Sequence, residues 1–193
     1  MPVNQNIRNF YNVAATRDFS RDFLFRVLDI KLQGVPGMNE DQLIYAKAAA
    51  LPGRNITNIP VKYMGLDINV PGGATYPGSA EYALNFFLDS ESELREYFET
   101  ASRNLFDDRD STGTYGTPNG NSFITLGQLD KGLNIISKYK LEGASIRAIN
   151  SIDYKMSEGT GATVDVGVTI AYHFYTALYE ITDFPDAIES VFI

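Results

Sequence analysis

Cysteine is absent from the 193-residue sequence, and histidine occurs once, at His173. The absence of cysteine excludes disulfides, thiolate catalysis and zinc sites built on cysteine, and it suits the cytoplasm. A Ser-His-Asp triad would have to be built around His173, yet the sequence contains no G-x-S-x-G elbow. We therefore expect His173 to be a structural strand residue and the chain to be no enzyme.

Basic residues are few relative to acidic ones: the sequence has 16 Lys and Arg and 24 Asp and Glu, which gives a formal net charge of -8. Such a chain lacks the positive footprint of a nucleic-acid binder. No apolar run approaches membrane-spanning length, and the N-terminus lacks the charged-then-apolar pattern of a signal peptide. We expect no stable membrane association.

Motifs for cofactors are also missing. No Walker sequence occurs, and Gly159 and Gly161 are followed by Val164 where a dinucleotide fingerprint needs a third glycine. Residues 108–113 imitate the start of a calcium loop, but Asn119 stands where a bidentate Glu is required. Paired carboxylates for glycoside hydrolysis stay open, although nothing nominates a pair. The sequence therefore predicts no catalytic, cofactor-binding or metal-binding residue and no cofactor.

One long stretch, residues 90–105, has helical periodicity. Ser90 and Glu93 form a capping-box pattern at its start, and acidic residues fill the first turn. Its apolar residues form one stripe: Leu94, Tyr97, Phe98, Ala101 and Leu105. We predict one principal α-helix that lies on a sheet.

Most of the remaining chain has strand patterning. The strictest alternation runs over residues 163–175, and residues 122–129 are ambiguous. Further strands are predicted at residues 22–31, 42–49, 61–70 with an interruption at Gly65, 80–89, 135–142 and 145–156. Loops are predicted at residues 54–60, 71–78, 107–121 and 157–162. The fold class that follows is mainly β, with two packed antiparallel sheets in a sandwich or barrel.

The two ends differ from this central pattern. Helical spacing of Val3, Ile7, Phe10, Tyr11 and Ala14 indicates a short helix or docking arm, with Asn4 as a possible cap. The amphipathic tail ends in Val191, Phe192 and Ile193, and apolar residues at a free end usually dock on something. We expect one domain over residues 1–193, with an N-terminal arm of about residues 1–20 and a C-terminal extension of about residues 176–193.

An ordered series of short sequences carries a resemblance. The series reads DFSRDFLFRV at 18–27, AALPG at 49–53, IPV at 59–61, DINVPG at 67–72, Y-x-L-x-GA at 139–144 and VTIAY at 168–172. In this order and spacing the chain resembles the tail tube protein of contractile-tailed, myovirus-type bacteriophages, which is related to type VI secretion tube proteins. The resemblance covers about residues 7–175.

The resemblance implies a structural, non-catalytic subunit. Such subunits form six-fold rings that stack into a hollow tube inside a contractile sheath, and neighbouring sheets join into an inner β-barrel. The implied partners are copies of the chain, the tail sheath protein, baseplate and tail terminator proteins, and the tape measure protein and DNA in the lumen, without sequence-specific binding. The implied location is the virion tail, after synthesis in the bacterial host cytoplasm. An acidic wall suits a DNA conduit because like charge discourages adhesion.

Two segments are candidates for contacts between subunits. The stretch between the second and third predicted strands is the candidate for stacking on the adjacent ring, with a plain connecting loop as the alternative: Leu51, Pro52, Gly53, Arg54, Asn55, Ile56, Thr57 and Asn58. Val191, Phe192 and Ile193 are candidates for inter-subunit or sheath contacts. Residues 107–121 and the segment after Tyr175 depart from the compact form of the family.

Three alternatives remain from the sequence. The first two are a baseplate protein that initiates the tube and the tube protein of a type VI-like injection machine. A different class is a β-sandwich enzyme or carbohydrate-binding module, with its site in residues 107–121 and Tyr115 stacking on a sugar.

Overall fold

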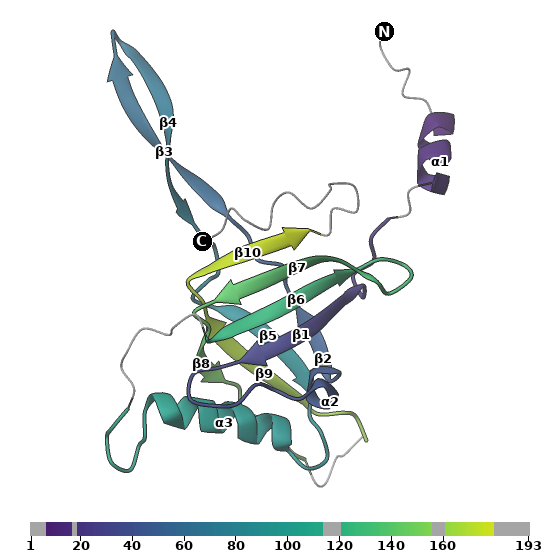
Figure 1. Cartoon of the computed structure of the whole chain (residues 1–193), viewed down its shortest axis with the longest axis vertical. Coiled ribbons are helices and arrows are strands. Elements are labelled where there is room, and N and C mark those ends of the chain that lie inside the picture. Colours follow the sequence, from purple (N-terminus) through teal and green to yellow (C-terminus); the bar gives the residue numbers. More distant parts are fainter. Residues whose placement is uncertain (1–6, 17–18, 114–120, 156–160, 180–193) are drawn as a thin grey trace.

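The computed structural model describes residues 7–16, 19–113, 121–155 and 161–179. In these residues two four-stranded sheets pack together, a two-stranded hairpin stands away from them, and every strand pair is antiparallel (Figure 1). The predicted mainly β fold with packed antiparallel sheets and one principal helix is confirmed.

The first sheet has the strand order β1-β6-β7-β10, with bounds β1 Phe25–Lys31, β6 Phe123–Leu129, β7 Ile135–Glu142 and β10 Phe174–Tyr179. Strand β7 has the predicted range, and the ambiguous stretch 122–129 is strand β6. A bulge between Val27 and Asp29 shifts the register of β1. Val27 and Ile30 are therefore both buried, whereas strict alternation over the predicted strand 22–31 would place them on opposite faces.

The second sheet has the order β2-β5-β9-β8, with bounds β2 Ala46–Ala49, β5 Tyr82–Phe87, β9 Asp165–Ala171 and β8 Ser145–Ile149. The alternation predicted for β5 is confirmed, because Tyr82, Leu84 and Phe86 are buried and the residues between them are exposed. Strand β8 is shorter than the predicted 145–156.

The predicted strand over residues 42–49 is wrong in its first half. Residues Glu40–Leu43 form the short helix α2, and β2 starts at Ala46. The Asn39 backbone N–H donates to Oε1 of Gln42 at 3.2 Å, which is the return bond of an N-terminal capping box. The Asn39-x-x-Gln42 spacing was the signal for this helix.

The single strand predicted over residues 163–175 is also wrong. The chain breaks at Tyr172 and His173, so that β9 belongs to one sheet and β10 to the other. Gly143 makes room at this crossing: its φ is +69°, and a Cβ there would lie 2.4 Å from Nδ1 of His173. His173 is thus an exposed residue of a crossover and not part of a continuous strand.

Helix α3, Glu93–Leu105, buries the predicted stripe through Leu94, Phe98 and Ala101. Its cap differs from the prediction. The carboxylate of Asp89, and not Ser90, accepts hydrogen bonds from the backbone N–H groups of Glu93 at 2.8 Å and Leu94 at 3.3 Å. A negative charge at this position also interacts favourably with the positive end of the helix dipole.

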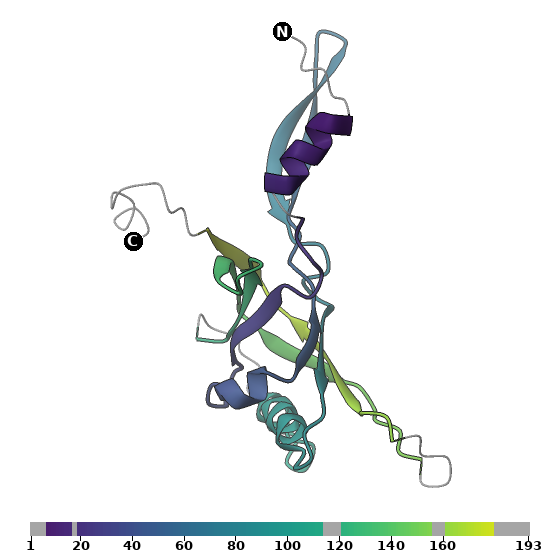
Figure 2. The same cartoon turned by 90° about the vertical axis from the view of Figure 1, so that its right-hand side faces the viewer.

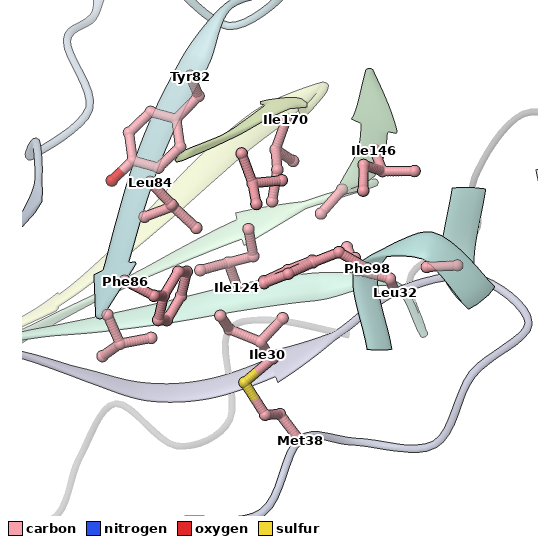
Figure 3. Packing of buried hydrophobic residues seen from close by; sticks show 14 of the residues in the cluster. Ile30, Leu32, Met38, Tyr82, Leu84, Phe86, Phe98, Ile124, Ile146 and Ile170 are labelled. Carbon is pink, nitrogen blue, oxygen red and sulfur yellow. The ribbon is translucent and has the colours of Figure 1, made fainter. Parts of the chain in front are cut away.

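The side chain of Phe98 projects from α3 into the core between the two sheets (Figure 3). Its ring centroid lies 5.5 Å from that of Phe86, and Ile30, Ile124 and Ile170 are fully buried around this centre. Burial of each such side chain is worth about 1.5–3 kcal/mol before conformational entropy is subtracted. The principal helix is present as predicted, and it lies at one end of the sandwich (Figure 1).

The N-terminal helix predicted from spacing is present as α1, Ile7–Thr16. Several sequence predictions fall outside the described residues and are not addressed by the structure: Val3 and Asn4, residues 114–120 of the 107–121 loop including Tyr115, residues 157–160 of the hairpin loop, and the terminal residues Val191, Phe192 and Ile193.

Candidate assembly surfaces

A long hairpin is the most exposed β-structure in the described chain. It consists of β3, Asn55–Tyr63, and β4, Leu66–Thr75. Met64 and Gly65, with φ of +51° and +81°, form the two-residue turn that joins them. The predicted loops are therefore wrong over residues 55–60 and 71–75, and residues 61–70 form parts of two strands and their turn instead of a single strand.

The local reason for these errors lies in the turn and proline residues. Gly65 suggested an interruption within one strand, whereas it is the second residue of the turn that joins two strands. Pro60 and Pro71 suggested loops, but a two-stranded ribbon has only edge strands, where proline is tolerated. Pro60 lies opposite Asn69 in the ladder, and Pro71 lies opposite Asn58.

One face of the hairpin is apolar. Ile59 pairs with Val70, Val61 with Ile68, and Tyr63 with Leu66, and residues directly opposite each other share a face. We call these six residues the hairpin apolar face: Ile59, Val61, Tyr63, Leu66, Ile68 and Val70. Their exposed fractions run from 43% at Val70 to 66% at Leu66.

The opposite hairpin face is polar, with Lys62 opposite Asp67 and Asn69 beside them. The hairpin extends away from both sheets (Figure 1). An isolated two-stranded hairpin is marginally stable in water and needs a further layer. A contiguous apolar patch of this kind marks an interaction surface.

The candidate stacking segment is divided by this structure. Residues 51–54 connect β2 to the hairpin, whereas Asn55–Asn58 open β3 and pair with β4. The interpretation of residues 55–58 as a loop is wrong, and a stacking role for residues 51–58 stays a prediction. Sequence reasoning missed the hairpin apolar face, although the alternation from Ile59 to Tyr63 was its signal.

Helix α1 is a second uncovered apolar element. Ile7, Phe10 and Tyr11 are 69%, 56% and 63% exposed. The ring of Phe10 contacts those of Tyr11 and Phe19, so the aromatic residues of this arm contact each other. The helix stands away from both sheets (Figures 1 and 2).

The outer face of the first sheet carries a concentration of cations. Val27 and Leu141 point inward, so their strand neighbours Arg26 and Lys140 point outward, and Lys138 shares the face of Lys140. The Lys140 ammonium lies 4.6 Å from the centre of the Phe123 ring. Asp29 and Glu142 lie on the same face by the strand register, so carboxylates are interspersed with these cations.

The described residues do not assemble a catalytic constellation around His173. Its backbone N–H donates to the carbonyl of Glu142 at 2.9 Å, and its ring lies over Gly143. Across the described ranges, no three His, Asp or Glu side chains gather where they would hold a metal ion. A hollow of about 460 Å³ is lined by Asp153, Lys155 and Asp165.

Among the tyrosines whose pKa is raised, Tyr82 and Tyr97 have a structural reason in the core. Burial raises the pKa of Tyr82, whose hydroxyl donates to the carbonyl of Ala50. Burial also raises the pKa of Tyr97 to about 12. Both hydroxyls join elements of the core, so these shifts reflect packing.

No helix in the described part of the chain is long and apolar enough to cross a membrane.

The fold of this chain is similar to that of chains in several solved structures. A chain of the anti-feeding prophage baseplate aligns with a TM-score of 0.57 at 11% identity, over 84% of this chain and 97% of that one. A chain of the anti-feeding prophage tube-terminating cap gives 0.57 at 9% identity, over 84% and 93%. A chain of the PVC sheath–tube complex, an extracellular contractile injection system, gives 0.53 at 9% identity, over 87% and 97%.

The chain has the fold of these injection-system subunits. The injection-system fold spans most of each chain compared, and it confirms the tail-tube resemblance at the level of fold. Neither family models nor curated protein sequences match the chain. The structural similarity therefore persists where sequence similarity is low.

Proposed function

We propose that the chain is a structural subunit of the tail tube of a contractile-tailed bacteriophage. The observation that carries this proposal is the uncovered hairpin apolar face on a fold shared with subunits of contractile injection systems. Six copies form a ring, and rings stack into a hollow conduit inside a contractile sheath, through which genomic DNA passes into the host.

The sheet edges support lateral assembly. Within the described strands, β1 and β10 border the first sheet, and β2 and β8 border the second. Open edges invite pairing with other chains, and closure into a ring removes that hazard. A head-to-tail contact between unlike surfaces closes into a ring when its rotation permits. Stacking is assigned to the base of the hairpin and its connection, residues 51–58.

The proposed subunit has no catalytic role. Its partners are copies of itself, the tail sheath protein, baseplate and tail terminator proteins, and the tape measure protein and DNA in the lumen, without sequence-specific binding. It resides in the virion tail after synthesis in the host cytoplasm. Val191, Phe192 and Ile193 remain candidates for inter-subunit or sheath contacts.

A second candidate is a subunit at the end of a tube or in another injection machine. The matches to a baseplate chain and a cap chain favour this alternative, and a type VI-like tube protein would share the same assembly logic. The carbohydrate-binding alternative depends on Tyr115, which lies outside the described residues.

Negative-stain electron microscopy of the purified full-length chain tests the proposal. We expect rings with a central hole and, at higher concentration, stacked tubes. Mass spectrometry of purified virions with intact and contracted tails then separates a phage tube from another injection machine. A chain that stays monomeric at every concentration and salt condition, and that binds glycans, would reject the tube.

A further inference from the structure

Helix α1 has an apolar face without a cover in the described chain. Ile7, Phe10 and Tyr11 recur at helical spacing and are each more than half exposed. Isolated helices shorter than about 12–15 residues are marginal in water, and α1 has 10 residues. An apolar surface packed against this face would therefore stabilise the helix.

The hairpin also has an apolar face that nothing covers in the described chain. Its six-residue apolar face is exposed, and a two-stranded ribbon gains stability when a helix packs against it. An amphipathic helix on an amphipathic ribbon would bury both surfaces at once. Each large side chain that is covered contributes to association through the hydrophobic effect.

The two faces do not meet within one chain. The hairpin and α1 rise beyond the same end of the sandwich but on opposite sides of it (Figure 1). The perpendicular view shows them over the same height (Figure 2). In a ring of identical copies, one flank of each copy lies beside the opposite flank of the next. In such a ring the hairpin flank of one copy can face the α1 flank of the next.

Charge also permits this contact. The hairpin carries Lys62 directly opposite Asp67, so its formal charge is balanced, and α1 has Arg8 as its only charged residue. Elsewhere the chain has a large excess of carboxylates. Contact between α1 and the hairpin therefore avoids the repulsion that two acidic surfaces would create.

We infer that α1 of one copy packs on the hairpin apolar face of the neighbouring copy in the same ring. The inference rests on the proposed ring and names the elements that are in contact at each boundary between neighbouring copies. The helix gives each copy a donor element and the hairpin gives it an acceptor, so the contact is heterologous and repeats at every subunit boundary.

Site-directed cross-linking tests this contact, because the natural chain has no cysteine and only introduced thiols react. Full-length Tyr11→Cys and Ile68→Cys variants carry different tags, are mixed, and assemble before treatment with a short bis-maleimide. We expect a cross-linked dimer that contains both tags. Asn69→Cys is the matched control, because Asn69 neighbours Ile68 on the same strand but faces the other side, and the mixed-tag product should be lost.

A second measurement covers the case in which cysteine at position 11 disturbs α1. Hydrogen exchange of the hairpin amides is compared in rings of the natural chain and rings of a Phe10→Ser variant. We expect the Phe10→Ser rings to lose protection in the hairpin and to keep it in β5 and β9.

The outcomes separate this inference from the proposed function. Rings that form without a mixed-tag product, with equal products for Ile68→Cys and Asn69→Cys, or with cross-links only inside one chain would overturn the contact and leave the tube subunit standing. Absence of rings from the natural chain under every condition would overturn both.

Discussion

Tyr97 shows how a single hydroxyl joins three parts of the fold. It lies on α3, donates to the carbonyl of Pro36 at 3.0 Å and accepts from the N–H of Leu32 at 3.4 Å. Desolvation by burial raises its pKa from 10.0 to about 12, because the charged phenolate is disfavoured there. The neutral hydroxyl is therefore the form that the folded state stabilises.

Replacement of Tyr97 by Phe should change the alkaline stability. The raised pKa means that the stabilisation is fully present below pH 10 and is lost as the pH rises towards 12. Tyr97→Phe should cost about 0.5–1.5 kcal/mol at pH 7 and should lose less stability than the natural chain above pH 10. Urea unfolding at several pH values measures the difference, and parallel pH curves for the two proteins would contradict the assignment.

His173 is the one residue whose chemistry invited a catalytic interpretation. It is exposed, and its ring lies over Gly143 at the crossover between sheets. We expect His173→Ala to leave ring formation intact and to change the free energy of unfolding by less than about 0.5 kcal/mol, as exposed substitutions usually do. Electron microscopy and urea unfolding check this, and a folded variant that fails to assemble would reopen a functional role.

At the scale of elements, the hairpin is a place where assembly can be altered without altering the fold of the two sheets. It has its own ladder and turn, and both of its faces are exposed, so changes on it leave the sandwich core untouched. Deletion of residues 54–58 would remove the first pairs of β3 and shift the strand. Substitutions on its two faces therefore give a cleaner test than a deletion.

Ile68→Lys should abolish or strongly weaken assembly, because it would bury a charge in an apolar contact. Asn69→Lys adds the same charge one residue away on the polar face and should assemble normally. Both variants should unfold within about 0.5 kcal/mol of the natural monomer, since neither touches the core. Light scattering after size-exclusion chromatography compares them, and equal loss of assembly in both would argue against the hairpin apolar face.

At the scale of the whole molecule, every copy carries the same formal charge of -8. Copies in a ring repel each other, and salt screens this repulsion because the Debye length falls from about 30 Å at 0.01 M to about 8 Å at 0.15 M. The apolar contacts proposed between copies are not weakened by such screening.

Assembly should therefore increase when the NaCl concentration rises from about 0.01 M to about 0.15 M. Light scattering at fixed protein concentration measures the change in mean mass, with sucrose of equal osmolality as the control for non-ionic effects. A decrease in mass over this range would show that ion pairs between opposite charges, and not apolar contacts, dominate the interfaces.

The sequence predicted elements whose local pattern and tertiary environment agree. The stripe of Leu94 and Phe98 and the alternation of Leu84 and Phe86 matched buried faces, so α3 and β5 were predictable. The hairpin was not, because Pro60 and Gly65 carry local loop signals that a long exposed ribbon tolerates. The candidate stacking segment was consequently placed in a loop, although half of it belongs to β3.

By itself, the sequence determined the fold class, the principal helix, the absence of cysteine chemistry and the acidic charge, because periodicity and composition are local or additive properties. Tertiary structure decided the bulge at Val27, the crossing at His173 and the position of the hairpin, because each depends on which residues lie opposite each other in space. It also decided that α1 and the hairpin apolar face remain apart in one chain. Their separation follows from the connection of strands across two sheets, which residue periodicity does not encode.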